Sequence, residues 1–164
     1  MSETRVSYRE RVRYEDLLLF WLDRINQYLN FEEKETIVYK GLNIERAVRS
    51  IRVFYNMLPQ VIRTEIDKRL GKPLLEYISY TTRFLWFPEK GVFYAYTVIP
   101  LDLVKDFEKE HKKGENPGAA VSLFLKYTNI TLSRLEECIR VIIDILHDYG
   151  LLFREEYQFE AREE

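Results

Sequence analysis

Three arginines spaced three residues apart are the part of this sequence best suited to chemistry. On a helix, Arg46, Arg49 and Arg52 would each turn by about 60° from the last, so all three would lie within a third of the circumference. Guanidinium groups along one edge can bind the phosphates of a nucleic acid strand. The alternative interpretation is a solvated helix face, with Glu45 as the acidic residue near enough to neutralise it.

The charges around these arginines are unevenly distributed along the chain. Residues 40–72 hold eight basic residues and three acidic ones, although the whole chain has a net charge of −2. A local basic face can attract phosphates whatever the total charge. In the second half of this segment, Arg63 with Asp67 and Glu65 with Arg69 are i,i+4 pairs, so a salt-bridged surface is the alternative there.

A second candidate feature is an aromatic segment near residues 82–98. The runs TTRFLWF and VFYAYTVI flank the turn sequence PEKG, and this pattern predicts a β-hairpin. Strand alternation places Phe84 and Trp86 on one face and Arg83 on the other. An exposed face would offer a platform for bases; the alternative is that helices cover both faces. The predicted nucleic-acid-binding residues are Arg46, Arg49, Arg52, Arg63, Arg69, Lys72, Arg83 and Trp86.

The motifs of common catalytic machinery are missing from the sequence. It contains no GxGxxG, GxxxxGK(S/T), HExxH or GxSxG motif. Cys138 is the only cysteine, and His111 and His147 are the only histidines, so an iron–sulfur cluster or a Cys/His zinc site lacks its ligands. We therefore expect a non-catalytic protein with no cofactor and no metal.

One spacing leaves an enzyme as a remote alternative. Arg140 and His147 stand seven residues apart on a predicted helix and so share one face. The pair resembles the Arg-x(4–6)-His motif of HEPN ribonucleases, in which both residues act at an RNA cleft between two protomers. The other interpretation is a surface arginine and a histidine favoured by the helix dipole at the last turn.

The elements that must position these residues are mainly helices. The fold class predicted is mostly α (α+β), a compact multi-helix domain with one β-hairpin near residues 82–98. A short strand is expected at 35–39 with a turn at Gly41, and Asn43 and Ser133 are expected to cap helices. Gly71 and Gly150 are expected to end helices. Helices are predicted at 15–29, 43–55, 59–70, 73–82, 100–113, 119–127 and 133–150.

The chain is expected to form a single domain over residues 15–153, preceded by a flexible basic arm at 1–14 and followed by an acidic tail at 154–164. The charged first residues do not resemble a signal peptide. The longest apolar run, Leu17 to Leu22, has six residues, against about 18 for a membrane span. A cytoplasmic protein with no membrane association is therefore expected, and its richness in Glu, Lys, Arg and Ile resembles a thermophile's composition.

Residues 57–91 resemble the start of the C-terminal domain of the archaeal and eukaryotic primase large subunit. In that family a Pro-x-Cys-(Ile/Met)-(Lys/Arg) run opens a helix, and an arginine-bearing segment follows. Val61 departs from the pattern, because it stands where the family places an iron–sulfur cysteine. The residues of this chain that carry the resemblance are Pro59, Ile62, Arg63, Arg83 and Phe84.

The resemblance implies a relative without the cluster, similar to the small accessory subunit of some archaeal primases. Such a protein would be a non-catalytic subunit of archaeal-type replication machinery that helps to hold template or primer. Its expected partners are a single-stranded DNA or RNA template and the protein subunits of a replication or transcription complex.

Two other functions remain open from the sequence. A helix, short strand, two helices and a hairpin follow the order of a winged helix, with residues 59–70 as recognition helix and 83–98 as wing. Residues 127–152 also have a residue pattern similar to a helix-turn-helix, although Glu136 and Glu137 would repel DNA phosphates. The third possibility is a structural or viral protein-interaction module.

Overall fold

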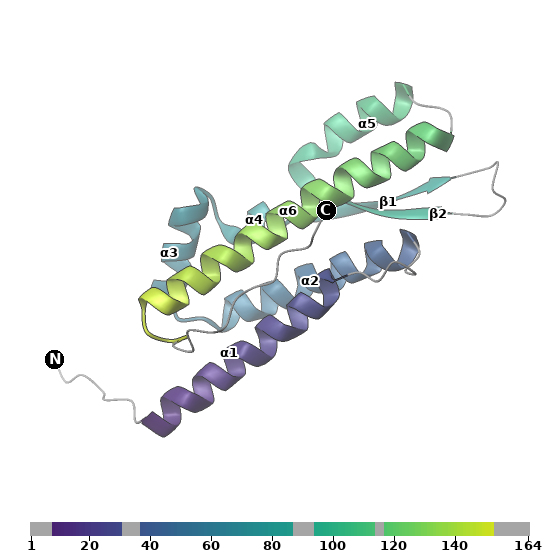
Figure 1. Ribbon diagram of the computed structural model, residues 1–164. Coiled ribbons are helices and arrows are strands. Elements are labelled where there is room, and N and C mark those ends of the chain that lie inside the picture. Colours follow the sequence, from purple (N-terminus) through teal and green to yellow (C-terminus); the bar gives the residue numbers. More distant parts are fainter. Residues whose placement is uncertain (1–7, 31–36, 87–93, 114–116, 153–164) are drawn as a thin grey trace.

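The structure is a computed structural model that describes residues 8–30, 37–86, 94–113 and 117–152. It is mostly helical with one antiparallel hairpin, so the predicted fold class is confirmed (Figure 1). In chain order the elements are α1 (Tyr8–Leu29), α2 (Ile37–Met57), α3 (Gln60–Leu70), α4 (Leu74–Tyr77), β1 (Tyr80–Trp86), β2 (Tyr94–Pro100), the 3-10 turn η2 (Leu101–Leu103), α5 (Val104–Lys113) and α6 (Pro117–Asp148).

The hairpin lies between two layers of helices. Its strands pair from Tyr80 opposite Pro100 to Trp86 opposite Tyr94. Helix α2 packs against one face of β2, and α5 and α6 pack against the other (Figure 1). As a result Val98 and Ile99 are fully buried although they point to opposite faces. The prediction of a hairpin near residues 82–98 is confirmed; its turn, PEKG, lies outside the described residues.

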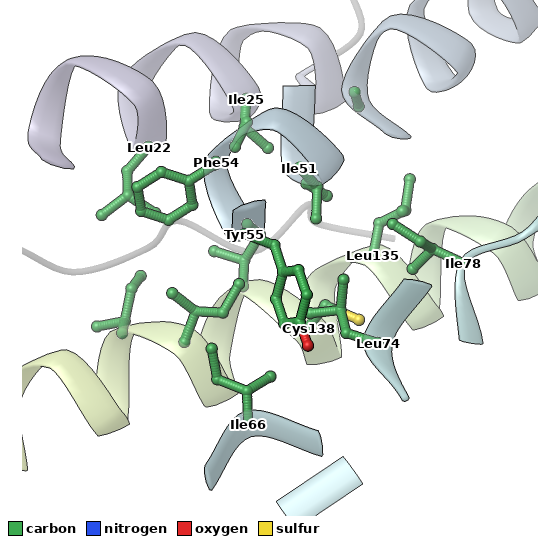
Figure 2. Close-up of a cluster of buried hydrophobic side chains, with 14 of the residues drawn as sticks. Leu22, Ile25, Ile51, Phe54, Tyr55, Ile66, Leu74, Ile78, Leu135 and Cys138 are labelled. Atoms are coloured by element: carbon green, nitrogen blue, oxygen red, sulfur yellow. The ribbon is translucent and has the colours of Figure 1, made fainter. Parts of the chain in front are cut away.

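The main core forms where α1, α2, α3 and α6 meet (Figure 2). Leu22 and Ile25 from α1 contact this core together with Ile51 and Phe54 from α2, and α6 closes it from the other side. A smaller cluster lies between β2, α5 and the first half of α6. Its buried members are Ile99, Phe107, Leu123, Phe124 and Tyr127.

Helix α2 begins earlier than the sequence predicts. The predicted strand at 35–39 is wrong from residue 37 onward, because residues 37–39 are helical; residues 35 and 36 lie outside the described part. Asn43 is not a cap, and Gly41 is not a turn, because both lie inside the helix. Gly41 serves another purpose: a Cβ built there would lie 2.0 Å from the carbonyl oxygen of Tyr96, so only glycine lets α2 approach β2 this closely.

Helix α6 is a single helix of 32 residues where two helices are predicted. Ser133 is therefore not an N-cap. The sequence YTNIT suggests a break, but Thr131 is buried and donates its hydroxyl to the carbonyls of Tyr127, at 2.9 Å, and Val98, at 3.1 Å. The bond to Tyr127 joins Thr131 to the carbonyl one turn earlier, a pattern found within continuous helices. The same continuity overturns the predicted helix-turn-helix at 127–152.

The other boundaries agree more closely with the predictions. Helix α3 starts directly after Pro59 and ends at Gly71, whose φ of 79° is left-handed, and Gly150 follows α6 with a φ of 69°. Residues 73–82 are helical only at α4, since β1 starts at Tyr80. Helix α1 begins at Tyr8, inside the predicted arm at 1–14, so residues 8–14 are helical; residues 1–7 and 154–164 lie outside the described part.

Candidate nucleic-acid interface

The three arginines of α2 form one edge of the helix beside the hairpin. We call Arg46, Arg49 and Arg52 the arginine edge. Arg46 is exposed and donates to Asn43 Oδ1 at 3.2 Å, whereas Arg49 and Arg52 lie close enough to Tyr80 of β1 to act electrostatically on its hydroxyl. Helix α2 carries four basic residues and one acidic one, Glu45, so its charge is positive.

Glu45 joins the arginine edge to the hairpin. Its side chain is nearly buried, and its two carboxylate oxygens have different partners. Arg49 Nη2 donates to Oε1, and the hydroxyl of Tyr96 donates to Oε2 at 2.5 Å. Since both groups hold the same carboxylate, the guanidinium of Arg49 and the ring of Tyr96 are neighbours. Arg49 stays 66% exposed, so it remains available to a ligand.

The tyrosines around Glu45 stay protonated to high pH. Burial and then the hydrogen bond to Glu45 raise the pKa of Tyr96. Burial and then the charge of Glu45 raise the pKa of Tyr80, against the lowering effect of a hydrogen bond from Arg49. Both hydroxyls are therefore neutral donors at physiological pH, and they add no negative charge beside the arginine edge.

An aromatic pair, with one exposed and one partly buried ring, continues this surface along the hairpin. Phe84 faces Tyr96 across the strands, with ring centroids 5.1 Å apart and planes at 65°. Phe84 is 63% exposed, so much of its side chain is accessible to solvent. The strand face that was predicted as an aromatic platform is thus covered at Tyr96 by α2 and uncovered at Phe84. A ring held in this way can stack against a nucleic acid base.

The other predicted residues do not join this surface. Arg83 lies on the opposite face of β1, where its guanidinium is 3.5 Å from Glu108 of α5. Trp86 belongs to β1, and its side chain lies outside the described part of the structure. Alternation assigns it to the face of Phe84, as the sequence predicts.

The basic residues of α3 serve mainly in its attachment to the rest of the fold. Arg69 is 3.3 Å from Glu65 and 2.8 Å from Asp148, at the far end of α6. Arg63 is half-buried beside the hydroxyl of Tyr55, which donates to both carboxylate oxygens of Asp67 at 2.9 Å. The predicted i,i+4 pair of Glu65 with Arg69 is therefore present.

Lys72 belongs to a different polar cluster, between α4 and α6. Its ammonium group lies 5.7 Å from the ring centroid of Tyr77, and the guanidinium of Arg134 lies 5.1 Å from the same ring. Arg134 also holds Asp102 through two hydrogen bonds of 2.7 and 3.0 Å. These contacts hold η2 against α6. The eight predicted residues therefore lie in at least four different parts of the structure.

Sequence reasoning missed the central role of Glu45. It treated Glu45 only as a neutralising neighbour, although the i,i+4 spacing to Arg49 predicts the ion pair that the structure contains. The bond to Tyr96 has no local signal, because 51 residues separate the two.

Arg140 and His147, the residues considered for catalysis, both belong to α6. Arg140 is exposed and lies 3.9 Å from Glu136, while His147 is half-buried in the last turn of α6. Within residues 8–152, apart from the three gaps, no three side chains of His, Cys, Asp or Glu gather as metal ligands.

None of the helices in the described part of the chain has the length and apolar character that crossing a bilayer requires. Comparison of the chain with family models, with curated proteins and with solved structures gives no match.

Proposed function

We propose that this protein is a non-catalytic accessory subunit that holds single-stranded nucleic acid. The arginine edge contacts phosphates of the strand, and the ring of Phe84 stacks against a base. The observation that carries the proposal is the pairing of Arg49 with Tyr96 through Glu45, because it puts an exposed guanidinium near the aromatic pair of partly buried Tyr96 and exposed Phe84. Single-strand binding proteins combine these two elements, and neither reads sequence.

The charge balance of the surface limits the strength of this binding. Glu45 offsets one of the three arginines, so the interface offers at most three phosphate contacts and a modest net charge. Weak binding with little sequence preference is the expected result. Such affinity suits a subunit that adds one contact surface to a larger assembly, where effective concentration supplements the affinity of each module.

Replacement of Arg46, Arg49 and Arg52 together by alanine is expected to weaken binding of a labelled oligothymidylate. The slope of log K against log salt concentration should become shallower by up to about 2, because three phosphate contacts at roughly 0.7 each on single strands are lost. Fluorescence anisotropy across a salt series measures both quantities. The matched control removes three exposed basic residues elsewhere, Lys105, Lys109 and Arg140, and should keep most of the affinity.

Phe84→Ala should separate stacking from charge. We expect a loss of roughly 1–3 kcal/mol in binding with almost no change of salt slope, because the substitution removes a ring and no charge. Val61→Ala, at another exposed apolar position, is the control. If both the arginine variant and the Phe84 variant bind as the wild type does, and circular dichroism shows a retained fold, this surface is only solvated and does not bind nucleic acid.

The assembly we propose is archaeal-type replication machinery, with this protein as a primase accessory subunit. Support comes from the resemblance of residues 57–91 to the primase large subunit and from the lack of cluster ligands. The tagged protein is expected to retain primase subunits from an extract of its source organism. Retention of its own promoter DNA instead would favour a winged-helix regulator, the weaker proposal because residues 37–39 are helical where that fold needs a strand.

A further inference from the structure

The side of α1 that faces away from the core carries exposed apolar side chains, and Trp21 lies at the edge of this side, partly buried against the core. We call Asp16, Leu17, Phe20, Trp21 and Arg24 the α1 stripe. Leu18 and Leu22 on the opposite side are buried in the core, whereas Leu17 is 41% and Phe20 57% exposed. A core-facing helix needs apolar residues on one side only, so large apolar side chains on the outer side point to a further contact.

The side chains of the α1 stripe are already ordered by one another. The rings of Phe20 and Trp21 meet edge to face, with centroids 6.1 Å apart and planes at 84°. The guanidinium of Arg24 lies 5.9 Å from the ring centroid of Trp21, and its Nε donates to the hydroxyl of Tyr28 at 3.4 Å. Binding at a surface with ordered side chains loses less conformational entropy, which favours association.

The charges of the α1 stripe are arranged symmetrically about Phe20. Asp16 lies four residues before Phe20 and Arg24 four residues after it, so each lies about 6 Å along the helix from the ring, in opposite directions. When a second α1 is laid antiparallel with Phe20 on the two-fold axis, Asp16 of each copy meets Arg24 of the other. A two-fold interface must be self-complementary in this way.

We propose that the α1 stripe binds a second copy of this chain, with the two α1 helices antiparallel and crossing at Phe20. The two Phe20 rings form the apolar centre, each in edge-to-face contact with its own Trp21, and two symmetric pairs of Asp16 with Arg24 flank it. The alternating charge along the stripe fits this occupant better than an anionic membrane, which would repel Asp16. The arginine edge takes no part, so the dimer is independent of the proposed function.

Charge reversal tests the pairing directly. Sedimentation equilibrium of the wild-type chain is expected to show dimers, and Asp16→Arg or Arg24→Asp should each weaken dimerisation by about 10-fold or more, because like charges then meet at both contacts. The double variant should regain most of the wild-type affinity. Asp144→Arg, at an exposed position of α6, is the matched control and should leave dimerisation unchanged. A double variant as weak as the single ones would overturn the pairing.

A cysteine at the centre provides a second test. Helices in contact lie about 8–10 Å apart, so residues on the two-fold axis come within reach of a disulfide. Phe20→Cys is expected to form disulfide-linked dimers under mild oxidation, whereas Val61→Cys, also exposed, should not. The native Cys138 is buried and does not compete.

Two results would reject a second copy as the occupant. A wild-type chain that stays monomeric at about 100 μM has no such interface. Maleimide labelling of Phe20→Cys that is slow in the full chain, and fast once residues 153–164 are removed, would assign the α1 stripe to the chain's own tail.

Discussion

Gly41→Ala is expected to destabilise the protein by about 3 kcal/mol, although within a helix alanine is more stabilising than glycine by up to about 1 kcal/mol. The added Cβ would lie 2.0 Å from the carbonyl oxygen of Tyr96 and 2.9 Å from its ring. Because the first of these atoms belongs to the backbone, α2 and β2 must separate. Urea unfolding followed by circular dichroism measures the change in the free energy of unfolding.

Gly71→Ala is the matched control for this substitution. It also places a Cβ on a glycine, but nothing lies within 4 Å of that Cβ, so its only cost is the left-handed φ of 79°. We expect roughly 1 kcal/mol there. An effect at Gly41 no larger than that at Gly71 would contradict a clash between α2 and β2, because Gly41 is helical and has no backbone penalty for alanine. The separation of α2 from β2 should also break the bond between Glu45 and Tyr96 and weaken nucleic acid binding.

Alkaline pH should remove several kcal/mol of stability between about pH 9 and 12. Burial is the main cause that raises the pKa of Tyr55, Tyr127 and Cys138 to about 12, from 10.0 for the tyrosines and 9.0 for the thiol. In the unfolded chain these groups lose their protons first. Their stabilisation is therefore complete below the unfolded pKa values and disappears as the pH rises through the folded ones, with up to about 1.4 kcal/mol per pH unit for each group.

Variants identify which groups cause the alkaline loss. Tyr127→Phe should make the fall of unfolding free energy with pH less steep between pH 10 and 12, by up to the contribution of one proton, about 1.4 kcal/mol per pH unit. Cys138→Ala should have the same effect from pH 9 upward. Tyr149→Phe, at an exposed position, is the control. Denaturant titrations at several pH values give the slopes. A slope that no single variant changes would contradict the assignment to buried groups.

Sequence patterns predicted the elements whose signals are local. Pro59 and Gly71 bracket α3 because their backbone preferences act within one turn, and the run of β-branched and aromatic residues marks both strands. The failures at Gly41, Asn43 and Ser133 have a common physical reason. Each residue type favours a turn or a cap in isolation, but here tertiary packing outweighs that preference, since the neighbouring residues extend a buried helix face.

The candidate site could be predicted only in part. The spacing of Arg46, Arg49 and Arg52 is enough to place them on one edge, and the alternation of β1 is enough to separate Phe84 from Arg83. The meeting of α2 with the hairpin depends on a pairing between Glu45 and Tyr96, far apart in sequence. No pattern within either segment specifies that register, so the neighbourhood of Arg49 and Phe84 follows only from the structure.

The position of α6 at the end of the described chain has a consequence for synthesis on the ribosome. This helix supplies core residues such as Leu135, Ile139 and Ile142, and it is tied to α3 through Arg69 and Asp148. While the first hundred or so residues emerge, the apolar faces of α1 and α2 lack the helix that completes their core. The chain therefore reaches its native packing only after α6 has emerged, and until then the apolar faces of its nascent helices are exposed and can be bound by a chaperone.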